Sequence, residues 1–207
     1  MKIGLISIAF QKLGLSPDMI FLLLLLSLLG SGINIPLRKL SSESLLEEQT
    51  VDFFGWKFRI PSARYSNATI LAVNLGGALI PASLSLFLIF RWWSLFFYIL
   101  VATIIVSFLV NRVARPVKGL GIATPALFPP LVAATVAIIL SLISSSGWDG
   151  APVIAYVSGT LGTLIGADLM NLKKIAGLGA PVASIGGAGT FDGVFLTGII
   201  AVILTSI

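Results

Sequence analysis

Six long stretches of this chain carry almost no charge, and they constrain its fold more than any other feature. Four of the stretches hold no charged residue, and the other two hold one aspartate each. A helix needs about 18–20 apolar residues to cross the hydrocarbon part of a bilayer, and every stretch reaches that length. The stretches are Met19–Leu37, Tyr65–Phe90, Trp92–Asn111, Gly119–Trp148, Gly150–Leu172 and Ile175–Ile207. We therefore expect a polytopic membrane protein.

The composition agrees with this class. The chain of 207 residues is 57% hydrophobic and only 10% charged, whereas soluble domains carry about 25% charged residues. We predict an all-α integral membrane fold, a bundle of about six transmembrane helices, forming one transmembrane domain over residues 1–207 of a cell-membrane protein. Residues 1–16 are expected to be an interfacial segment, because no small-residue cleavage site follows the next apolar block. The lipid bilayer is then the first partner, and a homo-oligomer is a further candidate.

Missing residue types exclude several chemistries. The chain has no cysteine and no histidine, which excludes disulfides, thiol catalysis, Cys/His metal sites and Ser-His-Asp catalysis. We expect neither a metal nor a cofactor. The net charge of +5 does not indicate nucleic-acid binding, because the basic residues lie in loops beside the apolar stretches, where anionic lipid and topology explain them.

The basic residues also predict an orientation. With six spans, ten basic residues fall on one side of the membrane (Arg38, Lys39, Lys57, Arg59, Arg64, Arg112, Arg115, Lys118, Lys173 and Lys174). Three fall on the other side (Lys2, Lys12 and Arg91). The positive-inside rule makes the first side cytoplasmic, so both termini are predicted outside.

The longest loop, residues 38–64, is cytoplasmic in this topology. Its segment "TVDFFGWKFRIP" alternates aromatic or apolar residues with charged ones, a period of two that indicates a strand. Gly55 is placed to turn a small β-hairpin that Pro61 ends. Such a hairpin either anchors on the lipid surface or has a functional role.

Two acidic residues stand apart from the other six. Asp168 and Asp192 lie inside apolar stretches, where a carboxylate costs about 3 kcal/mol or more and is usually functional. Residue 180, midway between them, falls in the helix-breaking "GLGAPVAS", so a hairpin of two helices would place both carboxylates at equal depth. They form a candidate dyad.

Further polar groups are predicted at the same cytoplasmic depth, as candidate binding residues. Glycines beside Asp192 are expected to break that helix and leave backbone amides free, and Gly162/Gly166 and Gly189/Gly193 form small-residue pairs that favour close packing of the last two spans. The candidate binding residues are Asn74, Thr124, Pro125, Asn171, Gly187, Gly189 and Thr190.

Three segments carry a family resemblance: "AVNLGGALIP", "RVARPVKGLGIATPALFPPL" and "YVSGTLGTLIGADLMNLKKIAGLGAPVASIGGAGTFDGVFLTGI". They resemble the prokaryotic membrane family called domain of unknown function 1614, over most of Ala72–Ile199. That family has no established activity, so the resemblance implies a membrane protein without specifying its chemistry.

A distant resemblance to intramembrane aspartate proteases rests on two aspartates in adjacent spans and on Pro125-Ala126-Leu127. Those proteases carry Gly-x-Gly-Asp, whereas Gly189-Thr190-Phe191 precedes Asp192 here, and their Pro-Ala-Leu follows the aspartates instead of preceding them.

Three functions stay open at this stage. The first is a hydrolase in which the two aspartates share a proton and activate water, while Asn74, Thr124 or amides near Gly187 and Gly189 hold a substrate carbonyl. The second is a proton- or cation-coupled transporter or channel, which at this size would need a dimer. The third is a structural role for both carboxylates.

Overall fold

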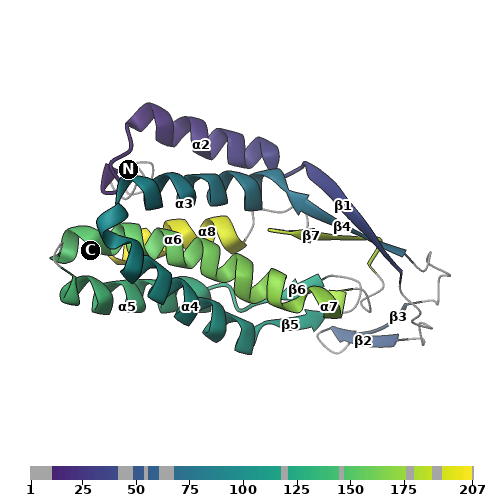
Figure 1. Ribbon diagram of the computed structural model, residues 1–207. Helices are drawn as coiled ribbons and strands as arrows, with labels where there is room; N and C mark the ends of the chain where they lie inside the picture. The colour runs from purple at the N-terminus through teal and green to yellow at the C-terminus, as the bar shows by residue number, and fades with distance from the viewer. Residues whose placement is uncertain are drawn as a thin grey trace.

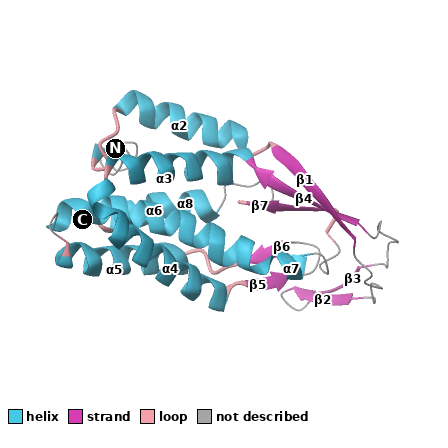
Figure 2. Ribbon diagram, in the orientation of Figure 1, coloured by secondary structure: helices cyan, strands magenta, loops and turns pink. Residues whose placement is uncertain are grey.

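Helices fill one end of the molecule and strands the other (Figure 1; Figure 2). The computed structural model describes residues 11–41, 49–53, 56–60, 68–117, 121–144, 147–175, 180–187 and 193–206. The main helices there are α2 (Pro17–Gly30), α3 (Ile80–Arg91), α4 (Phe96–Val113), α5 (Phe128–Ile143), α6 (Ala151–Thr163) and α8 (Gly193–Leu204).

Two of these helices are extended by irregular turns. The π-helix η1 (Leu75–Leu79) leads directly into α3. Beyond α6 the chain continues through the π-helix η4 (Leu164–Asp168), the 3₁₀ turn η5 (Leu169–Asn171) and the short α7 (Leu172–Ile175). Two further 3₁₀ turns, η2 (Trp93–Leu95) and η3 (Gly147–Gly150), precede α4 and α6.

A three-stranded sheet joins distant parts of the chain. Its order is β1 (Asn34–Ser41), β4 (Ala68–Asn74), β7 (Val182–Ile185). β4 runs antiparallel to β1, with Asn34 opposite Asn74, and parallel to β7, with Val73 opposite Ile185. The sheet therefore continues the helical bundle at the end where β4 becomes η1.

Two hairpins complete the strand-rich end. β2 (Gln49–Phe53) pairs antiparallel with β3 (Trp56–Ile60), which confirms the hairpin predicted around Gly55; the turn itself lies outside the described residues. A second pair, β5 (Arg115–Val117) with β6 (Gly121–Ala123), was not predicted.

The three-stranded sheet corrects the prediction of an all-α fold. The chain is mostly helical, but β1 begins within the first predicted span, and β4 and β7 lie within the second and the last. β4 in particular is a largely buried strand, and such a strand reads as a short continuous apolar run, which periodicity alone cannot distinguish from part of a helix. Among the described residues, two helices, Trp93–Val113 and Gly147–Lys174, are long and apolar enough to cross a membrane. Four other apolar helices are shorter, so a bundle of six spanning helices is not shown.

Helix α6 lies at the centre of the bundle. Every residue from Ala151 to Thr160 is buried, and the helix packs against α4, α5 and α8. A helix that is apolar on all sides belongs in such a position.

The continuous helical run of α6, η4, η5 and α7 forms a central rod. The glycines of this rod do not pack as predicted. A Cβ on Gly162 would lie 2.7 Å from the Cβ of Val106 in α4, and one on Gly166 would lie 2.3 Å from the carbonyl oxygen of Ser107. Both glycines therefore face α4, not α8. Gly159 and Gly198 make the close approach between α6 and α8 instead.

Candidate functional site

Asp168 lies where the central rod meets the sheet. It is the last residue of η4 and is half-buried. Its Oδ2 accepts a hydrogen bond of 2.8 Å from the backbone N–H of Gly186, the residue that follows β7. The parallel strands β4 and β7 end at this same edge, and the carboxyl ends of parallel strands are where open α/β sheets bind ligands.

Only glycine fits at position 186. Its φ of +80° is in the left-handed region, which side-chain-bearing residues rarely adopt. A Cβ there would also lie 2.8 Å from the backbone nitrogen of Ala78 in η1. Gly186 is thus pressed against η1 on one side and donates to Asp168 on the other.

Two π-helices flank this contact. π-Helices are rare and often occur at functional sites, because they change the backbone pairing locally. η1 contacts Gly186 through Ala78, and η4 ends at Asp168. The two irregular segments are 85 residues or more apart in the chain, yet they meet at one glycine.

Side-chain amides stabilise the irregular end of the rod. The carbonyl of Gly166 accepts hydrogen bonds from Nδ2 of Asn111 (2.9 Å) and Nδ2 of Asn171 (3.2 Å). Asn171 also donates to the carbonyl of Ala167 (2.9 Å), and its Oδ1 accepts from the Nζ of Lys174 (2.8 Å). The π-helix η4, which carries Asp168, is therefore held in place by Asn111 from α4 and by Asn171 from η5. Asn171, a predicted binding residue, uses its amide for this purpose.

Asn74, another predicted binding residue, is a buried N-cap. Its Oδ1 accepts from the N–H of Gly77 (2.7 Å) at the start of η1. Its Nδ2 donates to the carbonyl of Ser31 (2.7 Å) and to Oδ1 of Asn34 (3.0 Å). The hydroxyl of Ser184 in β7 donates to the same Asn34 oxygen. These bonds tie β1, β4 and β7 together beside Asp168.

Of the other predicted binding residues, Gly187, Thr124 and Pro125 are described by the structure, and Gly189 and Thr190 are not. Gly187 lies directly after Gly186, with φ +119°, and its N–H donates to the carbonyl of Ser184 (3.3 Å). Thr124 is half-buried and Pro125 is exposed, just after β6, and β6 contacts η4. Gly189, Thr190 and Asp192 lie outside the described residues, so the pairing of Asp168 with Asp192 stays a prediction; α8 begins at Gly193.

Sequence reasoning missed the partner of Asp168. The segment Val182–Ile185 is too short to show an alternating pattern, although the glycine pair that follows it is a signal for a turn. Asn111 was also missed, because one amide near the end of an apolar stretch does not indicate which carbonyl it bonds.

Strand β7 has one unpaired edge among the described strands. It pairs with β4 only, and Ile122 of β6 and Leu172 of α7 pack on the buried Ala183.

The described residues contain no cluster of three acidic side chains that could hold a metal ion.

A family model described as "Protein of unknown function (DUF1614)" matches residues 28–204. No match was found among curated proteins or among solved structures. The matched range spans the sheet, the bundle and Asp168.

Proposed function

We propose that this chain, which belongs to the DUF1614 family, is a membrane-embedded aspartate hydrolase that cleaves extended peptides. One observation carries the proposal: the carboxylate of Asp168 lies at the end of β7, a strand that has one unpaired edge among the strands that the structure describes. A reactive carboxyl group and a surface that recognises peptide backbone are thus adjacent.

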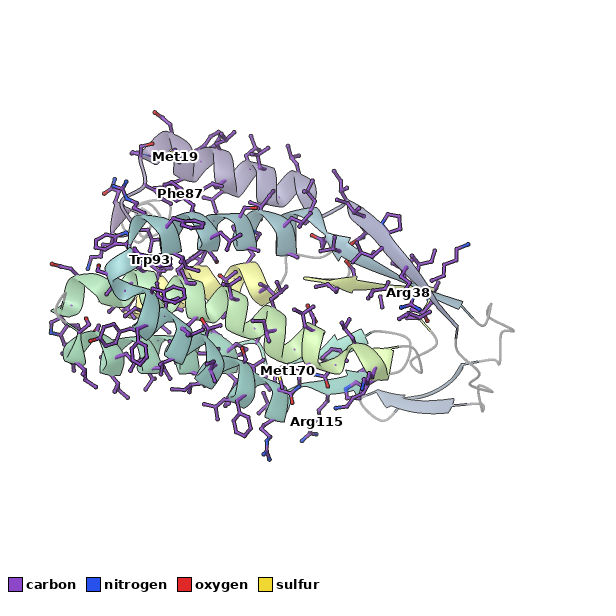
Figure 3. All side chains as sticks on the ribbon, in the orientation of Figure 1. Met19, Arg38, Phe87, Trp93, Arg115 and Met170 are labelled. Carbon is purple, nitrogen blue, oxygen red and sulfur yellow. The ribbon has the colours of Figure 1, made fainter. Side chains whose placement is uncertain are left out.

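Exposed apolar side chains support the membrane location. Phe21 of α2, Phe90 of α3, Phe97 of α4 and Ile143 of α5 are 67–73% exposed. Soluble monomers rarely expose apolar side chains over so many elements, whereas lipid-facing helices do. Figure 3 shows Met19 on α2 and Trp93 toward one end of the bundle, with Arg38 and Arg115 toward the strand-rich end. The strand-rich end then faces the cytoplasm by the positive-inside rule.

The shorter helices fit a thin or locally deformed bilayer. α2 has 14 residues and is about 21 Å long at 1.5 Å per residue, less than the ~30 Å hydrocarbon core. Short spans are accommodated by thinning of the bilayer around them. Thinning would also bring water, a reactant in hydrolysis, toward Asp168.

The chemistry requires a second carboxyl group, which we assign to Asp192. Two neighbouring carboxyl groups share one proton, because both cannot ionise easily at short range. The ionised group removes a proton from a water molecule as its oxygen attacks the peptide carbonyl carbon, and the protonated group donates to the carbonyl oxygen. Collapse of the tetrahedral intermediate breaks the C–N bond, and the nitrogen takes up a proton. The products are a carboxylic acid and an amine.

The substrate class follows from β7. An extended peptide adds to an unpaired strand edge through backbone hydrogen bonds, which are independent of sequence. A peptide in that position would pass Gly186 and so approach Asp168.

The test uses purified protein in lipid nanodiscs and a pool of internally quenched peptides with apolar centres. Fluorescence should rise with wild type and not with Asp168→Asn or Asp192→Asn, both of which should melt near the wild-type temperature. Asp18→Asn, in the first turn of α2, is the matched control and should keep full activity. Cleavage that persists in both site variants would refute the dyad, and so would a folded wild type that cleaves no peptide in the pool.

A further inference from the structure

The pairing of β7 with β4 fixes the direction of each backbone group along β7. The N–H of Ile70 in β4 donates to the carbonyl of Pro181 (2.9 Å), and Ile70 lies opposite Val182. Because the bonds of a parallel ladder alternate along the strand, every second residue, starting at Pro181, bonds to β4. The N–H groups of Val182, Ser184 and Gly186 therefore point away from β4, toward the unpaired edge.

Asp168 occupies the end of this unpaired edge. Its Oδ2 accepts from the N–H of Gly186, the last of the three outward groups. The carboxylate oxygen is thus placed where the backbone carbonyl of a further strand would be. The outward N–H groups of Val182 and Ser184 have no hydrogen-bond partner in the part of the chain that the structure describes, so they remain for such a strand.

The opposite edge of the sheet, on β1, is protected against pairing. It carries Pro36, which has no N–H, an irregularity in the pairing between Pro36 and Arg38, and the charged Lys39. Proline, bulges and lysine are common features of edges that do not pair with another strand. β7 has none of them: its sequence is VASI, and its pairing with β4 is regular. The contrast indicates that the edge of β7, unlike that of β1, is suited to a partner strand.

The two faces of the sheet differ beside this edge. On one face Ala183 is buried, and Ile122 of β6 and Leu172 of α7 pack against it. On the other face the hydroxyl of Ser184 donates to Oδ1 of Asn34. Residues that lie opposite each other on neighbouring strands have their side chains on the same face. A strand added to β7 would thus place its residues alternately on an apolar face and on a polar face.

We propose that β7 binds an extended peptide in which apolar and polar residues alternate, in a register that ends at Asp168. The peptide backbone bonds to Val182 and Ser184. Its apolar side chains lie on the face of Ala183, and its polar side chains lie on the face of Ser184. The peptide bond that reaches Gly186 then lies at the carboxylate. Cleavage of the bound peptide rests on the proposed hydrolase function, whereas its binding requires only the edge.

Fluorescence anisotropy tests the binding with the intact protein in lipid nanodiscs, and mass spectra of the same samples report cleavage. The probe is a short labelled peptide in which leucine and serine alternate. A second peptide has the same composition, with the leucines in one block and the serines in another, and lipid-only discs give the background. The alternating peptide should bind more tightly, because the block peptide cannot match both faces in any register.

Proline variants isolate the backbone bonds. Val182→Pro removes an outward N–H and leaves the bonds to β4 in place. It should bind the alternating peptide about tenfold more weakly than Val182→Ala, which keeps the N–H, since one backbone hydrogen bond is lost. Lys39→Pro is the matched control on β1: Lys39 lies opposite Ile70, whose N–H bonds toward β7, so the N–H of Lys39 also points outward. This variant should bind as wild type does.

The same bonds can be removed from the peptide, which keeps the test decisive if Val182→Pro does not fold. Methylation of the serine nitrogens blocks an antiparallel strand and methylation of the leucine nitrogens blocks a parallel one, so one series should lose binding and the other should keep it. Equal binding by the two series, or by Val182→Pro and Val182→Ala, overturns the edge assignment. Equal binding of the alternating and block peptides overturns the sequence pattern. Edge-dependent binding without cleavage supports this site and contradicts the hydrolase, whereas cleavage without edge-dependent binding does the reverse.

Discussion

The carboxylate of Asp168 accepts a 2.8 Å hydrogen bond from the backbone N–H of Gly186, and this contact joins the central rod of the bundle to strand β7. The two residues belong to different predicted spans, and the sequence alone does not indicate that they are in contact. The contact holds one oxygen of the carboxyl group and leaves the other oxygen for chemistry or for a second partner.

Removal of that acceptor should destabilise the fold. Asp168→Ala leaves the Gly186 N–H without its partner, at a cost of about 1–3 kcal/mol. Asp168→Asn keeps an oxygen at the same place and should cost less than about 1 kcal/mol. Thermal unfolding in one detergent, compared across both variants and Asp18→Asn, measures the difference. Equal melting temperatures for the alanine and asparagine variants would contradict the structural role of the bond.

Gly186→Ala should be more damaging than its small size implies. The left-handed backbone conformation alone costs a residue with a side chain about 1–2 kcal/mol, and the new Cβ would overlap the backbone of Ala78. Gly32→Ala is the control, since its nearest heavy atom would be 3.9 Å away. The expected result is a clear loss of thermal stability for the first variant and almost none for the second.

Gly166→Ala tests the packing of η4, the π-helix that continues α6, against α4. The added Cβ would lie 2.3 Å from the carbonyl oxygen of Ser107, a backbone atom that cannot move without its helix. Overpacking of this kind costs about 1–3 kcal/mol or more. Gly193→Ala adds a Cβ that meets nothing within 4 Å and should melt as wild type does. A wild-type melting temperature for Gly166→Ala would mean that the rod and α4 are further apart than described.

Labelling of single cysteines tests the orientation, and a chain without cysteine gives no background. Gln11 is exposed and lies next to Lys12, which bonds Ser206 just after α8, at the helical end of the molecule. Leu37 is exposed on β1, at the strand-rich end. Because the ten basic residues of the loops after the first, third and fifth predicted spans are expected on the cytoplasmic side, an impermeant maleimide added to intact cells should label Gln11→Cys and not Leu37→Cys. Labelling of both from outside would refute the predicted topology.

The amino-acid sequence by itself determined the apolar character of the helices, the isolation of Asp168 and the β2–β3 hairpin. Each of these is local: it depends on residue types and on their spacing over a short segment. The alternation in Gln49–Phe53 and Trp56–Ile60 predicts strands because their pairing partner is the next segment of the chain.

Only the tertiary structure decided that β4 and β7 are strands, which glycines face which helix, and which group bonds Asp168. β4 pairs with β7 across a separation of 112 residues, from Ile70 to Val182, and no local pattern encodes such a partner. The apolar residues of β4 suit a buried helix as well as a buried strand, so the choice depends on hydrogen-bond partners supplied from elsewhere in the chain. Gly186 likewise owes its role to Ala78 and Asp168, two residues that reach it only after the bundle and the sheet have formed.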